Sequence, residues 1–361
     1  GNENSHQIGT RKGREREGKR LQAVCAFFSL FPRVLLLLLW CVFQPTQTGM
    51  SGVAGLQPGQ YADLWFYERL YVDVLERIGG FHVVTSLSFL FLILIYVGTS
   101  LPYWIIDYFQ PAFLTKYKIQ QDTHVSTADT WKCIKRLIFN HLVLALPLNY
   151  LSYPILEWRG LSFDFPAPTW YELLGRVCIY FFIEDLWFFV GHWLLHTPWA
   201  YRNIHAIHHE FNTPIAMASS YAHPVEFIFL GVGTFLGPII IGGGHIFSVW
   251  VWLFFRQVEA IEVHCGYDFP WHLNHILPIY CGPFHHDYHH YSVNGNFAST
   301  FVWWDRIFGT DHKYRAWVNR GGHKSDKARL EGISSSKNGN STAAKTPLAN
   351  GGDSVKHGKA A

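Results

Sequence analysis

Three stretches rich in histidine decide how this chain folds: His192-Trp-Leu-Leu-His196, His205-Ala-Ile-His208-His209 and His286-Asp-Tyr-His289-His290. Fourteen of the 21 histidines lie between the first and the last residue of this set, so the enrichment is local rather than general. On a helix, positions i and i+4, or i, i+3 and i+4, share one face. Each stretch therefore presents two or three imidazoles in one direction.

This clustering predicts a metal site. A neutral imidazole is a good ligand for iron, zinc or copper. The three stretches offer more imidazoles than one tetrahedral zinc accepts, and their number suits two ions that share a site. Leaving so many imidazoles buried without partners would cost about 1–3 kcal/mol each. The predicted ligands are His192, His196, His205, His208, His209, His285, His286, His289 and His290, together with His223 and His264.

Three acidic residues are predicted to support these ligands. Asp185 precedes His192 by seven residues, which returns it to nearly the same face of a helix. A carboxylate placed there can accept the second ring N–H of a ligand and fix its tautomer. Asp268 forms an i,i+4 pair with His264, and Asp287 lies within the third stretch, so both are candidates for the same role.

The composition indicates a chain that meets lipid. Apolar residues make up 49% of the sequence and charged residues 15%, against about 25% charged in a soluble domain. Residues 82–106 and 137–156 carry no charged side chain and are long enough to span a bilayer. Residues 227–255 are uncharged and contain a Gly/Pro-rich middle, which predicts a helical hairpin. The expected fold is therefore an all-α, multi-span membrane bundle that holds a di-metal site.

Three regions are expected along the chain. Residues 1–49 precede the first methionine and form either a targeting segment or untranslated sequence read in frame. Residues 50–318 form the membrane catalytic domain. Residues 319–361 are polar and are expected to be a disordered tail.

The six cysteines form no C-x-x-C pair, which argues against a disulfide framework or a zinc ribbon. The net charge of +3 is small, and no nucleic-acid partner is expected.

Longer strings around the histidines carry a family resemblance. The three stretches resemble the histidine boxes of the fatty acid hydroxylase/sterol desaturase superfamily. Within that superfamily, residues 184–311 are similar to the 4-methylsterol monooxygenases. The matching strings are Glu184-Asp185, His205 to Phe211, Tyr221-Ala-His-Pro224, His264-Cys-Gly-Tyr-Asp268, His285 to His290, Asn296 to Phe301 and Trp303 to Asp311.

The resemblance implies a function and its requirements. It implies oxidation of a sterol C4 methyl group through alcohol and aldehyde to carboxylate, with two iron ions per chain and O2 as co-substrate. Zinc has no redox chemistry and does not suit this reaction. The resemblance also implies NAD(P)H electrons through cytochrome b5 and its reductase, and cooperation with other sterol C4-demethylation enzymes. It implies an endoplasmic reticulum membrane with a helical cap and the metal site facing the cytosol.

Other functions remain open at this point. Sterol C5 desaturation, fatty acid hydroxylation and aldehyde deformylation use the same histidine boxes. A metal transporter is a further alternative, but it would place its histidines along a pore within the spans. Here most histidines follow the apolar stretches, beside polar residues such as Arg202, Asn203 and Glu210.

Overall fold

The structure is a computed structural model that describes residues 63–121 and 123–323. Within these ranges the regular secondary structure is helical and no strand forms, which confirms the all-α prediction for that part of the chain. The expected N-terminal extension at 1–49 lies outside the described residues. So does nearly all of the expected tail at 319–361.

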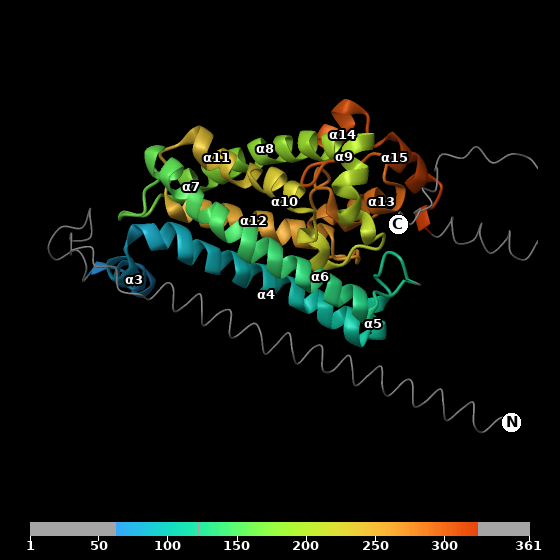
Figure 1. Ribbon diagram of the computed structural model, residues 1–361, viewed down its shortest axis with the longest axis horizontal. Helices are drawn as coiled ribbons and strands as arrows, with labels where there is room; N and C mark the ends of the chain where they lie inside the picture. Colours follow the sequence, from blue (N-terminus) through green and yellow to red (C-terminus); the bar gives the residue numbers. More distant parts are fainter. Residues whose placement is uncertain (1–62, 122, 324–361) are drawn as a thin grey trace, which may run out of the picture.

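Two long helical rods run along the longest axis of the molecule (Figure 1). The first consists of the π-helical turn η1 (Val83–Leu87) and α4 (Ser88–Phe109). It is preceded by α3 (Phe66–His82), which lies at the left of Figure 1 and is kinked at Gly79, where φ is +75°. The short helix α5 (Ala112–Thr115) follows it. The second rod consists of α6 (Thr127–Phe139), the π-helical turn η2 (Asn140–Ala145) and α7 (Leu146–Trp158). The apolar stretches predicted at 82–106 and 137–156 lie in these two rods.

Four further helices pack beside the rods: α8 (Trp170–Leu195), α10 (Pro224–Gly231), α11 (Gly233–Ile241) and α12 (Ile246–Val263). Helix α12 packs against both α4 and α8 and so joins the rods to these helices. Its Trp252 is fully buried and meets Phe181 of α8 edge to face. Burial of such large apolar side chains supplies the main driving force for the packing.

Short helices gather at one end of the bundle, at the right of Figure 1. They are α9 (Pro198–Asn203), η3 (His205–Glu210), η4 (Ala216–Ser220), η5 (Leu273–His275), α13 (Gly282–Ser292), α14 (Trp303–Phe308) and α15 (His312–Asn319). All three histidine stretches reach this end.

The predicted helical hairpin is present, with α10 and α11 as one arm and α12 as the other. Its turn lies at Gly242 and Gly243, where φ is +64° and +55°, a backbone conformation that glycine adopts without steric cost. Gly237 lies inside α11 rather than in the turn. A Cβ on Gly237 would come within 2.9 Å of the Cα of Tyr180. Glycine therefore allows α11 to approach α8 closely. Helix α10 also packs on α8, where Gly191 of α8 lies against Phe229 and Leu230 of α10.

Within the part of the chain that the structure describes, two helices are long and apolar enough to cross a membrane: Phe66–Phe109 and Pro224–Ile241. The first contains the predicted stretch 82–106. The predicted stretch 137–156 is helical but does not reach the same apolarity, because Asn140, His141 and Asn149 interrupt it.

Candidate metal centre

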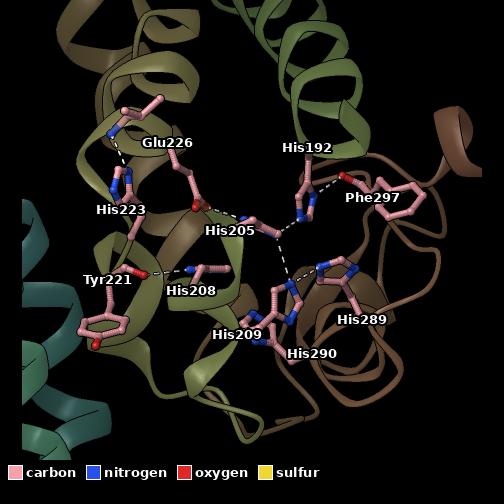
Figure 2. A network of polar contacts seen from close by, with 12 residues as sticks. His192, His205, His208, His209, Tyr221, His223, Glu226, His289, His290 and Phe297 are labelled. Atoms are coloured by element: carbon pink, nitrogen blue, oxygen red, sulfur yellow. Dashed lines mark hydrogen bonds and ion pairs between the residues drawn. The ribbon is translucent and has the colours of Figure 1, made fainter. Parts of the chain in front are cut away.

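Among the described residues, nine histidines converge into two groups. Figure 2 shows some of them, His192, His205, His208, His209, His289 and His290. The first group is His192, His196, His205, His209 and His289, and the second is His208, His264, His286 and His290. Within each group one ligand atom per residue lies within 4.8 Å of every other. All are buried except His196, which is partly buried. Two groups agree with the predicted di-metal site.

Four elements carry these side chains to one place. His192 lies in the last turn of α8, and His196 follows directly as its C-cap. The second stretch forms the 3-10 helix η3, and the third stretch lies on α13. His264 is the C-cap of α12. Because η3 and α13 each contribute to both groups, they hold the two groups side by side.

Hydrogen bonds at Nδ1 set the tautomers of five of these imidazoles. In the first group, Nδ1 of His192 and His289 donates to the carbonyl oxygens of Phe297 and Gly295, both at 2.8 Å. In the second, Nδ1 of His208 lies 3.0 Å from the carbonyl oxygen of Tyr221, and Nδ1 of His264 lies 2.7 Å from that of Ala260. A carbonyl oxygen only accepts, so each Nδ1 must carry the proton. Each Nε2 then carries the lone pair.

The fifth imidazole has a carboxylate partner. Nδ1 of His205 lies 2.8 Å from Oε1 of Glu226, and both side chains are buried (Figure 2). A carboxylate that accepts from a ligand histidine fixes its orientation and raises its basicity.

In each group, two lone pairs consequently face one another. Nε2 of His192 lies 3.1 Å from Nε2 of His205, and Nε2 of His208 lies 3.3 Å from Nε2 of His264. Neither pair can form a hydrogen bond, because in each pair both protons are on Nδ1. Two nitrogens bound in cis to one metal at about 2.1 Å would be about 3.0 Å apart. A cation between the lone pairs resolves the conflict in each group, so the side chains fit a metal centre.

Burial keeps these imidazoles neutral. It lowers the pKa of His208 to about 4. Burial, reinforced by neighbouring imidazoles, also lowers the pKa of His264, His286 and His290 well below the usual value. A neutral imidazole is the form that binds metal, so the second group can accept a cation near neutral pH without first losing a proton.

Asp185 does not contact a ligand histidine, which corrects the expected arrangement. Its Oδ1 accepts from the backbone N–H of Thr300 at 2.9 Å and of Phe301 at 3.4 Å. The carbonyl of Phe297, in the same loop, takes the Nδ1 proton of His192. Asp185 therefore acts on the ligand indirectly, by holding the loop at 297–301.

Asp268 and Asp287 also lie away from the ligand nitrogens. Asp268 Oδ1 lies 2.9 Å from Nε2 of His275 and not beside His264. Helix α12 ends at Val263, so the i,i+4 geometry expected for this pair does not exist. Asp287 accepts from Nε2 of Gln120 at 2.9 Å, and its other oxygen lies 2.7 Å from Nε2 of His323.

Two of the predicted ligands stay outside both groups. His223 is the N-cap of α10, and its Nδ1 accepts from the backbone N–H of Val225 at 3.2 Å. His285 lies with its Nε2 3.5 Å from Oδ2 of Asp305. Its neighbour His286 points into the second group, because consecutive residues on a helix point about 100° apart.

Two supporting residues were not predicted from the sequence. Glu226 is the first, although an acid just inside an apolar stretch and next to a histidine string is an unusual position. Asp305 is the second, and it accepts from the backbone N–H groups of Phe297 and Ala298 at 2.8 and 3.0 Å. The string Trp303-Trp304-Asp305 carries part of the family resemblance, but nothing in the sequence indicates this role for Asp305.

Buried charges also join α8 and α12 beneath the site. Nε of Arg256 donates to Oε1 of Glu184 at 2.8 Å, and the same guanidinium pairs with Glu259. Glu259 in turn accepts from the hydroxyl of Ser299 at 3.2 Å. The loop that carries Phe297 is thus held by Asp185, Asp305 and Glu259.

Comparison with known proteins gives matches over the same region. A family model described as fatty acid hydroxylase matches residues 177–310. Methylsterol monooxygenase 2-2 of Arabidopsis thaliana is 41% identical over 253 residues, which cover 69% of this chain and 94% of the relative. Methylsterol monooxygenase 1 of Rattus norvegicus is 39% identical over 255 residues, covering 70% and 86%.

A relative with a different name is equally similar. Very-long-chain aldehyde decarbonylase GL1-11 of Oryza sativa subsp. indica is 41% identical over 238 residues, covering 65% of this chain and 88% of the relative. No solved structure matches the chain.

Proposed function

Because the chain belongs to the fatty acid hydroxylase family, we propose that it is a methylsterol monooxygenase, an O2-dependent oxidoreductase that acts on the C4 methyl groups of sterols. The observation that carries the proposal is the pair of histidine groups, each with two Nε2 lone pairs facing one another. Relatives named methylsterol monooxygenase supply the substrate class.

The two groups would each hold one iron ion. Iron with O2 supplies an oxidant strong enough for an unactivated methyl C–H bond, which zinc cannot do. The side chains of this protein hold and orient the ligands. Glu226 accepts the Nδ1 proton of His205, and backbone carbonyls accept those of His192, His208, His264 and His289. Burial of eight of the nine imidazoles limits access of bulk water to the reaction.

The membrane setting is part of the proposal. The two apolar helices would anchor the chain in the endoplasmic reticulum membrane, and the end that carries the histidines would form a cap facing the cytosol. Electrons would come from NAD(P)H through an external donor such as cytochrome b5 and its reductase. Other sterol C4-demethylation enzymes would then take the oxidised sterol. The apolar substrate explains why an oxidase site would lie beside membrane helices.

Aldehyde decarbonylation is the second candidate function. It is favoured by the similarity to the Oryza sativa protein of that name. The same metal centre would serve both reactions, so the histidines do not separate them. The two candidate functions differ in their substrates, so a test of substrates and products distinguishes them.

Product analysis tests the proposal. Membranes from a host that lacks its own enzyme and expresses this chain would be incubated with a 4,4-dimethylsterol, O2 and NADPH. We expect C4-oxidised sterols, and none from a His289→Ala variant expressed to the same level. Conversion of a long-chain aldehyde to a hydrocarbon, with no oxidised sterol, would overturn the assignment in favour of decarbonylation.

A further inference from the structure

One tyrosine lies directly against the first histidine group. The ring centroid of Tyr201 is 5.5 Å from that of His196 and 5.6 Å from that of His209. The ring of His205 is also close, at 6.2 Å. All three imidazoles belong to the first group. Tyr201 therefore contacts the ligands themselves, with no side chain in between.

The short helix α9 brings Tyr201 to this place. Helix α8 ends at Leu195, and α9 begins at Pro198 after only two residues. Proline suits the first position of a helix, because its φ is already helical and no N–H is needed there. The backbone N–H of Tyr201 then donates to the carbonyl of Thr197 at 2.8 Å and closes the turn. The segment that joins the first two histidine stretches thus lays the ring of Tyr201 on both of them.

The other aromatic side chains that touch the ligands are phenylalanines. Phe188 lies 5.3 Å from His192, and Phe297 lies 4.9 Å from His196. In the described part of the chain, the rings that touch the second group are all imidazoles. A phenol carries an O–H and gives up an electron with that proton far more readily than a phenylalanine ring does. Among the described residues, Tyr201 is therefore the one phenol or indole ring in contact with the ligands.

Tyr201 also lies between the first group and solvent. Its side chain is partly buried, and it covers His196, the one ligand that is itself only partly buried. On the same helix, Trp199 is 67% exposed and Arg202 is exposed. A phenol in this position can pass an electron inward to the centre and release a proton outward to water.

Electron counting shows when such a group is needed. Reduction of O2 to two water molecules takes four electrons. When a sterol is oxidised, the external donor supplies two electrons, and the C–H bond that becomes C–OH supplies the other two. Without a sterol the last two are missing, and a strong oxidant remains at a centre enclosed by imidazoles. Tyr201 is then the nearest phenol that can supply an electron.

We propose that Tyr201 is a redox-active side chain that reduces the metal centre when O2 reacts there without a bound sterol. In each event the O–H bond of Tyr201 breaks. The electron goes to the O2-oxidised centre, the proton goes to water at the exposed side of α9, and a neutral tyrosyl radical remains. One electron from the external donor and one proton from water restore the phenol. Two such events supply the two missing electrons, and the oxygen atoms leave as water.

The iron and the O2 in this proposal rest on the proposed function, whereas the place of the phenol comes from its contacts. Electron paramagnetic resonance tests it without a substrate. The full chain in phosphatidylcholine nanodiscs would be loaded with ferrous iron, reduced with stoichiometric dithionite, mixed with O2 and frozen. We expect an organic radical whose lines narrow when the tyrosines are ring-deuterated. No radical in the wild-type chain would overturn the proposal.

Two variants locate the radical. Tyr201→Phe keeps the ring but lacks the O–H, and it should lower the radical signal at least tenfold at equal iron content. The matched control is Tyr314→Phe, whose ring lies 5.1 Å from His285, outside both groups. The control should give the wild-type signal. An equal signal in Tyr201→Phe would overturn the role of Tyr201.

A spin trap locates the radical without any substitution. A nitroso trap added to the wild-type reaction should give adducts on Tyr201, identified by mass spectrometry of the peptides. This measurement decides the question even where Tyr201→Phe binds less iron. Adducts confined to other tyrosines would contradict the proposal.

Oxidative damage to the ligands tests the purpose of the radical. Repeated cycles of reduction and O2 without sterol should add oxygen to the peptides that carry His196 and His209. We expect about threefold more oxygen on these peptides in Tyr201→Phe than in the wild-type chain or in Tyr314→Phe, because the centre then oxidises its own ligands. Equal damage in all three proteins would show that Tyr201 does not discharge the centre.

The outcomes separate this inference from the proposed function. A radical on Tyr201 in a chain whose membranes leave the sterol unoxidised would support the redox role and contradict the enzyme assignment. Normal sterol oxidation with no radical on Tyr201 would contradict the redox role and support the assignment.

Discussion

The two histidine groups differ in what supports them. The first has five histidines and a buried carboxylate, Glu226, behind His205. The second has four histidines, and the described acceptors of its Nδ1 protons are the carbonyls of Tyr221 and Ala260. Because a carboxylate raises the basicity of its histidine more than a carbonyl does, the first group should hold its metal more tightly. The comparison teaches that one centre is built from two unequal halves, which substitutions can separate.

Removal of one histidine ligand should have the largest effect on iron content and activity, and it should distinguish the two groups. His289→Ala should empty the first group and His286→Ala the second, and each should abolish sterol oxidation. Metal analysis of the purified variants should give about one iron per chain instead of about two, since each histidine group would hold one ion. Loss of all iron from both variants would show instead that the groups act as one site.

Glu226→Gln should have the next largest effect, and it should act on the first histidine group alone. Glutamine keeps the shape but removes the charge, which typically costs about 10-fold to 100-fold in metal affinity. A chelator titration of the purified variant should therefore release one iron earlier than the other. The matched control is Glu76→Gln, an exposed acid on α3. Equal weakening of both irons would contradict the unequal halves.

Asp185→Asn should have an intermediate effect through the loop at 297–301. Burial raises the pKa of Asp185 to about 8, so near neutral pH the substitution replaces a mainly neutral acceptor of two backbone N–H groups, at a cost of about 0.5–1.5 kcal/mol. We expect a lower thermal midpoint and partial loss of activity, with the first iron affected through His192. An unchanged midpoint with full loss of activity would point instead to a direct role for Asp185 in the reaction.

His223→Ala separates capping from metal binding. The side chain accepts a hydrogen bond at the start of α10, and loss of such a cap costs about 1 kcal/mol. Iron content should stay at the wild-type level while the thermal midpoint falls slightly. A loss of one iron would show that His223 is a metal ligand.

Asp268→Asn should have the smallest effect. The carboxylate pairs with the partly exposed His275, and exposed pairs of this kind contribute about 0–1 kcal/mol. Iron content and activity should remain those of the wild type. A marked loss of iron would mean that Asp268 reaches His264 in solution.

The histidine ligands could be predicted because their spacing is local. Positions that share a helical face do so wherever the helix is placed, and the eight histidines of the three stretches do converge. The acids could not be assigned in the same way. Glu226 meets His205 only after α10 packs beside α8, where Gly191 lies against Phe229 and Leu230, and the spacing of residues along the chain does not reveal this contact.

The spacing of residues gave wrong predictions for two acids, Asp268 and Asp185. In one case the helix ends before the predicted partner, and in the other a loop covers the predicted face. The predicted pair of His264 and Asp268 required a continuing helix, but α12 stops at Val263 and the chain turns through Gly266 with φ +75°. Asp185 does lie on the expected face of α8, yet the loop at 297–301 covers that face and its backbone N–H groups take the carboxylate. The spacing of residues within one segment does not indicate which distant segment will pack against it.

X-ray absorption at the iron edge of the purified full chain tests the central claim most directly. The account predicts a coordination shell dominated by imidazole nitrogen, with an average of between four and five per iron, since the groups contain five and four histidines. A shell dominated by carboxylate oxygen or sulfur, or one with about two imidazoles per iron, would contradict it.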